Sequence, residues 1–132
     1  MTPSLEWISR RMPTPVTVVD DSALSRKIMI KSLPAEWSVE ITQAGNGVEA
    51  LEAYHAGKAH VMFLDLTMPV MDGYQVLETL KKEGLNTMVI VVSADIQPMA
   101  QERVLSLGAM AFIKKPVDTD KVRKILADFG IL

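Results

Sequence analysis

Short apolar runs alternate with segments of helical periodicity along most of the chain. Five of the runs are rich in Val, Ile, Leu and Met, stop at a polar residue and are typical of strands. The segments between them carry apolar residues three and four positions apart, and Asp, Ser, Gly or Pro stands at many of their ends, as at helix termini. The pattern predicts strands over Val16–Val19, Val39–Ala44, Val61–Leu64, Met88–Val92 and Met110–Ile113, and helices over Ala23–Leu33, Val48–Ala56, 73–82, 98–107 and 119–129.

The regular alternation of strand and helix indicates an α/β domain. Strands that are apolar on both faces need cover on both sides, and crossover helices supply that cover for a parallel sheet. In such a sheet the ligand site forms at the carboxyl ends of the strands. The polar residues at these ends are therefore the candidate functional residues, and they are Asp20, Asp21, Asp65, Ser93 and Lys115.

Composition and charge narrow the classes of function. The chain has 132 residues, of which 48% are hydrophobic and 23% charged, as expected for one packed domain. Fourteen Lys and Arg against sixteen Asp and Glu give a net charge of -2, which argues against nucleic acid as a direct ligand. The absence of Cys, with only two His, argues against a zinc site. Because no apolar run is long enough for a membrane helix and no signal-peptide pattern opens the chain, we expect a cytoplasmic protein with no membrane partner.

Three of the strand-end residues are carboxylates from two different strands. Bringing Asp20, Asp21 and Asp65 together is unfavourable unless a cation lies among them or one carboxyl takes up a proton. Oxygen ligands without Cys or His favour Mg²⁺, which usually keeps water and phosphate oxygens as further ligands. Lys115 offers a positive charge to a phosphate, Ser93 offers a hydroxyl, and Asp65 is the candidate covalent acceptor. The alternative for Asp20 and Asp21 is that they only cap the following helix.

The order and spacing of several motifs between Val16 and Phe129 resemble the receiver domain of response regulators. The resemblance implies a doubly wound, five-stranded parallel sheet of order 2-1-3-4-5 with five helices, the flavodoxin-like or CheY-like fold. Residues 15–132 would form the receiver domain and residues 1–14 an N-terminal extension. The motifs are Asp20-Asp21-Ser22, the run 46–51, Asp65 followed by Met68-Pro69 and Met71-Asp72-Gly73, Ser93-Ala94, Gly108-Ala109 and Lys115-Pro116.

The same resemblance implies the chemistry of two-component phosphorelay signalling. Asp65 would accept a phosphoryl group from a sensor histidine kinase. Mg²⁺ would be held by Asp20, Asp21, Asp65 and the backbone carbonyl of Thr67, and Lys115 would pair with the phosphoryl group. The protein would thus be a phosphoacceptor that can dephosphorylate itself rather than an enzyme.

The family's switch couples a hydroxyl residue to an aromatic residue on the fifth strand, here Ser93 and Phe112. Phosphorylation would draw the Ser93 hydroxyl inward, and the aromatic ring would fill the space behind it. Phe112 stands where tyrosine is usual, and Thr67 replaces the common asparagine. Asp95 lies near the same opening and would tune the lifetime of the phosphorylated form.

Output would pass through protein contacts on the face formed by the fourth helix, fifth strand and fifth helix. Because only short segments flank the predicted domain, we expect a stand-alone regulator. Chemotaxis through the flagellar motor switch is the leading role, and a phosphatase is another partner to consider. A phosphate sink, a phosphorelay intermediate or a regulator of another enzyme are the alternatives.

Two rival functions rest on parts of the same sequence. Gly45-x-Gly47-x-x-Ala50 after a strand partly matches a dinucleotide-binding fingerprint, with Asp65 about twenty residues further on. A Mg²⁺-dependent phosphohydrolase would also use Asp65 as its nucleophile. The haloacid-dehalogenase pattern, however, has its general acid and base aspartate two residues later, where this chain has Thr67.

Overall fold

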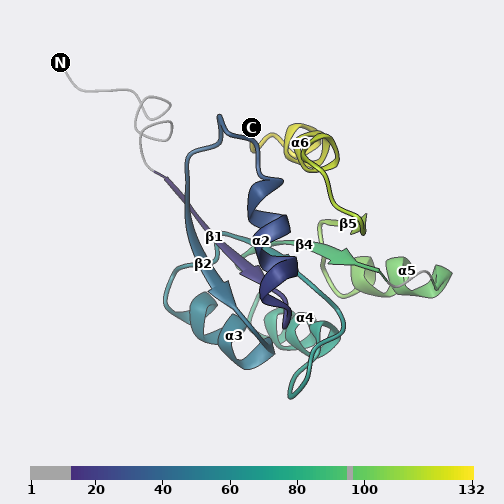
Figure 1. Cartoon of the computed structure of the whole chain (residues 1–132). Coiled ribbons are helices and arrows are strands. Elements are labelled where there is room, and N and C mark those ends of the chain that lie inside the picture. The colour runs from purple at the N-terminus through teal and green to yellow at the C-terminus, as the bar shows by residue number, and fades with distance from the viewer. Residues whose placement is uncertain (1–12, 95–96) are drawn as a thin grey trace.

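The computed structural model describes residues 13–94 and 97–132, which contain a five-stranded parallel sheet and five helices (Figure 1). The strand order is β2-β1-β3-β4-β5, so the chain moves first to one edge of the sheet and then to the other. The elements are β1 (Thr14–Val19), α2 (Ala23–Lys31), β2 (Val39–Ala44), α3 (Gly47–His55), β3 (Val61–Leu64), α4 (Gly73–Lys82), β4 (Met88–Ser93), α5 (Pro98–Ser106), β5 (Ala111–Lys114) and α6 (Thr119–Asp128). The predicted doubly wound fold is confirmed.

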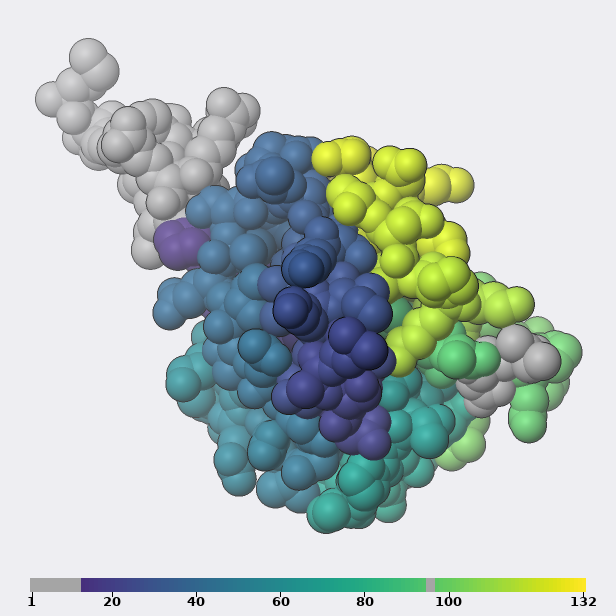
Figure 2. All heavy atoms as spheres, in the orientation of Figure 1, coloured from purple at the N-terminus to yellow at the C-terminus, as the bar shows by residue number. Residues whose placement is uncertain are grey.

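Two apolar cores lie on opposite faces of the sheet. One contains side chains of α3, α4 and α5, such as Ala50, Leu77 and Val104, packed on alternate residues of the strands. The other contains Met29 of α2 and Leu126 of α6 against the other set of strand residues. Figure 2 shows the face covered by α2 and α6. β3 is buried along its whole length, as a central parallel strand should be, because both of its faces contact helices.

Several predicted termini are confirmed by the caps that form them. Ser22 caps α2, and its hydroxyl accepts a hydrogen bond from the Ser25 amide. Asp72 caps α4 through a reciprocal capping box with Gln75. Asp118 caps α6 by accepting from the Lys121 amide. These three helices therefore begin where a side-chain oxygen satisfies one of the first free amides.

Some predicted bounds were wrong by one or two residues. β1 begins at Thr14 instead of Val16, because β2 runs alongside and supplies hydrogen-bonding partners that an apolar pattern does not reveal. α2 ends at Lys31 rather than Leu33. Phe129 is not part of the buried stripe of α6; it follows the last helical residue and is 47% exposed.

The described helices include none that is both long and apolar enough to cross a membrane. The residues 1–12 and 95–96 lie outside the described part of the chain, so most of the predicted N-terminal extension and Asp95 are not placed.

Candidate functional site

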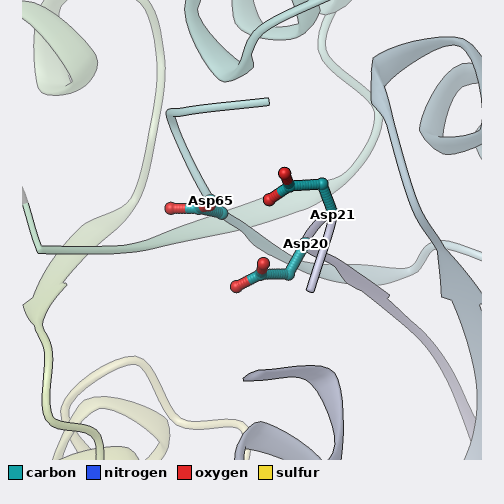
Figure 3. Close-up of side chains that lie close together, drawn as sticks. All are labelled: Asp20, Asp21 and Asp65. Carbon is teal, nitrogen blue, oxygen red and sulfur yellow. The ribbon is translucent and has the colours of Figure 1, made fainter. Parts of the chain in front are cut away.

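Three carboxylates meet at the carboxyl ends of β1 and β3 (Figure 3). Asp20, Asp21 and Asp65 each offer one oxygen, and these atoms all lie within 4.8 Å of one another. Adjacent parallel strands bring the residues together, and the Asp65 amide donates to the Val19 carbonyl at the end of the ladder. Asp20 and Asp65 are buried, whereas Asp21 is exposed. The predicted convergence of the three acids is confirmed in geometry.

Lys115 reaches this cluster from the end of β5. Its Nζ donates to Oδ2 of Asp20 at 2.9 Å and lies 3.8 Å from Oδ1 of Asp65. The Lys115–Pro116 peptide is cis. The neighbouring Lys114 is exposed. The structure therefore selects Lys115 as the lysine of the site.

Backbone amides hold two of the carboxylates in place. The Ser22 amide donates to Oδ1 of Asp20 at 2.9 Å, and the Leu66 amide donates to Oδ1 of Asp65 at 2.9 Å. These hydrogen bonds fix the orientation of each carboxylate, and the Oδ2 atom of each still has no backbone amide on it in these contacts. Asp20 does not cap α2 directly, since that role belongs to Ser22. The alternative that Asp20 and Asp21 only cap the following helix is thus wrong, because Ser22 is the N-cap of α2.

Burial raises the pKa of Asp65 to about 6 from its usual value of 3.8. Lys115 lowers the pKa, the negative charge of Asp20 raises it, the Leu66 amide lowers it, and Asp21 raises it slightly. Desolvation and carboxylate repulsion thus outweigh the single lysine. A cation placed among the three acids would remove this repulsion. Three carboxylates are oxygen donors of the kind that Mg²⁺ prefers, so the site suits this ion.

The loop between β3 and α4 packs closely against the Asp65 backbone. The Gly73 amide donates to the Leu66 carbonyl at 3.0 Å. A Cβ atom at Gly73 would lie only 2.4 Å from the Asp65 carbonyl oxygen and 2.8 Å from Cα of Leu66. Only glycine permits this approach. The start of α4 therefore packs directly against the backbone of Asp65 at the end of β3.

Gly47, the second glycine of the partial dinucleotide fingerprint, has a packing role. Its amide donates to the Met71 carbonyl at 3.2 Å, and a Cβ atom there would lie 2.6 Å from Cγ of Met71. Asn46 caps α3 by accepting from the Glu49 amide. The glycine is therefore explained by contact with the β3–α4 loop and needs no bound phosphate.

Ser93 and Phe112 occupy neighbouring strands on one face of the sheet. Ser93 ends β4, is 1% exposed, and shares its face with Val91 two residues earlier. Phe112 pairs in register with Val91 and packs half-buried against the core under α4 and α5. This placement suits the predicted switch. Thr67 is exposed two residues after Asp65, and metal binding by its carbonyl stays a prediction.

Arg26 is a site residue that sequence reasoning missed. Its Nη1 donates to the Asp20 backbone carbonyl at 2.7 Å, and its Nε donates to the Gln43 side chain at 2.9 Å. The guanidinium thus joins the end of β1 to the end of β2 beside the cluster. The sequence offers only a basic residue one turn after the Ser22 cap. This alone does not indicate a site residue, because its partner Gln43 on β2 comes near it only in the folded chain.

A model of the response regulator receiver domain matches residues 16–127. The chain belongs to this family. The matched range includes all five strand ends, and hence every candidate site residue that the structure places. The chain is therefore a receiver domain of the kind found in two-component response regulators.

Known receiver proteins include relatives of very different length. Chemotaxis protein CheY of Bacillus subtilis (strain 168) is 33% identical over 108 residues, which cover 81% of this chain and 89% of that relative. Protein-glutamate methylesterase/protein-glutamine glutaminase 2 of Koribacter versatilis (strain Ellin345) is 41% identical over 110 residues, which cover 81% of this chain but 30% of that relative. The chain spans 26% to 35% of the length of the methylesterase relatives that it matches.

Solved structures show the same architecture. In the crystal structure of the CheX-CheY-BeF3-Mg+2 complex from Borrelia burgdorferi, one chain matches with a TM-score of 0.82 and 31% identity. The match covers 92% of this chain and 92% of that chain. The likeness therefore extends over nearly the whole described fold.

Proposed function

We propose that this receiver domain accepts a phosphoryl group on Asp65 from a sensor histidine kinase and transmits the signal through protein contacts. The observation that carries the proposal is the buried Asp65 carboxylate, which faces two further acids and the Lys115 ammonium at the end of the sheet. An acceptor carboxylate needs a neighbouring positive charge for the incoming phosphoryl oxygens, and Lys115 supplies one. The domain acts as a phosphoacceptor with self-dephosphorylation, not as an enzyme on other substrates, and it works in the cytoplasm.

Mg²⁺ is the cofactor that the donor set favours. Asp20, Asp21 and Asp65 would hold it together with the Thr67 carbonyl, and the ion would neutralise the charge of phosphoryl and carboxylate oxygens. The similar CheY chain in the CheX-CheY-BeF3-Mg+2 complex from Borrelia burgdorferi supports this assignment, because that complex contains Mg²⁺. Lys115 keeps its hydrogen bond to Asp20 and stands beside Asp65, so it can pair with the phosphoryl group.

The signal is proposed to leave through α5, β5 and α6. Phosphorylation draws the Ser93 hydroxyl toward the site, and Phe112 moves into the space behind it, which changes this face. Resemblance to CheY proteins over about nine tenths of their length supports a role in chemotaxis, with the flagellar motor switch as target. The methylesterase match supports a second role, regulation of a catalytic domain or partner enzyme.

Intact-protein mass spectrometry after incubation with phosphoramidate and Mg²⁺ tests the acceptor. The expected result is one phosphoryl adduct in the wild type, lost in Asp65→Asn and in samples with excess EDTA. Glu40→Gln, the same loss of a carboxylate at an exposed position on β2, is the matched control and should keep the adduct. An adduct of equal yield in Asp65→Asn would show that another residue is the acceptor.

A further inference from the structure

Asp21 has the least support of the three acids at the end of the sheet. The carboxylates of Asp20 and Asp65 each accept a backbone amide, from Ser22 and Leu66 respectively. Within the described part of the chain, no hydrogen bond or ion pair reaches the carboxylate of Asp21, which is exposed. Figure 3 shows this carboxylate beside the other two. Its place in the cluster therefore depends on the backbone that carries it.

The backbone at Asp21 lies just beyond the last hydrogen bond between β1 and β2. The Asp20 amide donates to the Ala44 carbonyl at 3.1 Å, which ends this pairing. The Asp20 carbonyl belongs to the next peptide unit, whose nitrogen is the amide of Asp21. Arg26 donates to this carbonyl from Nη1 at 2.7 Å. One side chain of α2 therefore holds the peptide that joins the two acids.

A second strand fixes the Arg26 side chain itself. Its Nε donates to Oε1 of Gln43 at 2.9 Å, and Gln43 pairs in register with Val18 on β1. A guanidinium is planar and carries its donors in a rigid fork, so two hydrogen bonds set both its position and its orientation. The side chain therefore ties the peptide after β1 to β2.

The start of α2 has little apolar packing on the side that faces β5. A pocket of about 120 Å³ lies there, between α2 and the segment after β5, and Ser25, Ile28 and Met29 line it from the helix. Asp20 lines the same pocket. Atoms that face a void lack van der Waals partners on that side. The hydrogen bonds of Arg26 therefore carry more of the positioning of the helix against the acids.

We propose that Arg26 is a positioning residue for the metal, which sets the affinity for Mg²⁺ by holding the Asp21 carboxylate in the cluster. The inference rests on the proposed function, in which Asp20, Asp21 and Asp65 hold Mg²⁺. The guanidinium of Arg26 has only donors and so offers no ligand atom to a cation. Hydrogen-bonding groups outside the ligand set change metal affinity by about 10- to 100-fold, because they hold the ligands in place.

The charge of Arg26 acts on metal binding in the opposite direction from its hydrogen bonds. A positive charge beside the acids repels a cation, so removal of the charge alone should strengthen Mg²⁺ binding. Removal of the bridge should weaken Mg²⁺ binding, because the peptide that carries Asp21 then loses its support. The sign of the change in affinity therefore separates positioning from electrostatics.

Three substitutions make the test specific. Arg26→Met removes both side-chain hydrogen bonds and keeps an unbranched side chain that favours a helix. Gln43→Met removes the acceptor on β2 and changes no charge. Arg123→Met is the matched control, since Arg123 also donates from its Nε, to Glu36. Glu36 precedes β2, so this pair lies at the amino ends of the strands, away from the acids.

The first experiment titrates each protein with MgCl₂ alone and follows the Ser22 and Leu66 amides by NMR, because these amides donate to two of the acids. We expect Arg26→Met to raise the Kd for Mg²⁺ by about tenfold. Gln43→Met should raise it by a smaller factor, and Arg123→Met should bind as the wild type does. The amide spectra also show whether each variant is folded.

The double variant Arg26→Met/Gln43→Met should bind Mg²⁺ as Arg26→Met does, since both substitutions break the same bridge. An unchanged or lower Kd in Arg26→Met would overturn the proposal, as would a double variant whose increase is the product of the two single ones. Gln43 is exposed on an edge strand, so Gln43→Met tests the bridge even where Arg26→Met does not fold. An unchanged Kd in Gln43→Met would then overturn the proposal.

A rate measurement separates this inference from the proposed function. With phosphoramidate, the Mg²⁺ concentration for half-maximal adduct formation should rise about tenfold in Arg26→Met, by a larger factor than the rate at saturating Mg²⁺ falls. No adduct in the wild type, together with the expected change in Kd, would refute phosphorylation of Asp65 and leave the role of Arg26 standing. Adduct formation with an equal Mg²⁺ requirement in both proteins would refute only the role of Arg26.

Discussion

Replacing Asp65 by Asn should stabilise the metal-free protein at neutral pH, although it removes the proposed phosphoryl acceptor. The residue is 8% exposed and its carboxylate stands beside two other acids, so its ionised form is unfavourable in the fold. Asn has nearly the same shape as protonated Asp, and its carbonyl oxygen can still accept the Leu66 amide. The substitution therefore removes the unfavourable charge while leaving the packing intact.

The magnitude follows from the pKa of Asp65, which the fold raises from 3.8 to about 6. Between these values the folded protein holds a proton that the unfolded chain has released, so stability falls as pH rises through this window. A difference of about two pKa units corresponds to about 3 kcal/mol in the free energy of unfolding. The advantage of Asp65→Asn should approach this value above pH 6 and vanish below about pH 4.

Urea unfolding followed by circular dichroism, with EDTA present, measures the effect at pH 4 and pH 7.5. Wild type and Asp65→Asn should unfold at similar urea concentrations at pH 4. The variant should be more stable at pH 7.5, by about 1 to 3 kcal/mol. Glu40→Gln is exposed on β2 and should show no comparable gain. If Asp65→Asn gains nothing at pH 7.5, the electrostatic account of the site is incorrect.

Three further substitutions probe the surroundings of the cluster. Lys115→Met removes the cation that lowers the pKa of Asp65, so an NMR titration of the Asp65 carboxyl carbon should give a pKa above about 6; an unchanged titration would contradict the contact. Gly73→Ala should cost about 1 to 3 kcal/mol in the free energy of unfolding measured by chemical denaturation, because its Cβ would meet the Asp65 carbonyl, whereas Gly45→Ala meets only the ends of the flexible Glu49 and Arg26 side chains at 3.4 and 3.8 Å and should cost less than half as much. Val70 is 83% exposed with φ at 68°, so Val70→Gly should raise the free energy of unfolding by about 1 kcal/mol; a loss of stability would mean that Val70 is not strained.

The local elements of this protein could be predicted from its sequence because each depends on neighbours along the chain. The run Val61–Leu64 is apolar at every position, and the structure confirms a strand buried on both faces. Asp72 and Asp118 begin helices because their side chains accept from amides three residues ahead. The strand-end acids were identifiable for a similar reason, since an abrupt change from apolar to charged marks where a buried strand reaches the surface.

The tertiary structure decided the relations between distant parts of the chain. Lys115 and Asp20 are 95 positions apart, and only the pairing of β1, β3, β4 and β5 brings their side chains to 2.9 Å. The exposure of Phe129, the bridge from Arg26 to β2 and the pocket beside α2 likewise depend on how the elements pack. The raised pKa of Asp65 belongs to the same class, because burial and the charges around it exist only in the folded chain. Periodicity and capping act over a few residues, whereas distance, burial and electrostatics arise from packing between segments far apart in sequence.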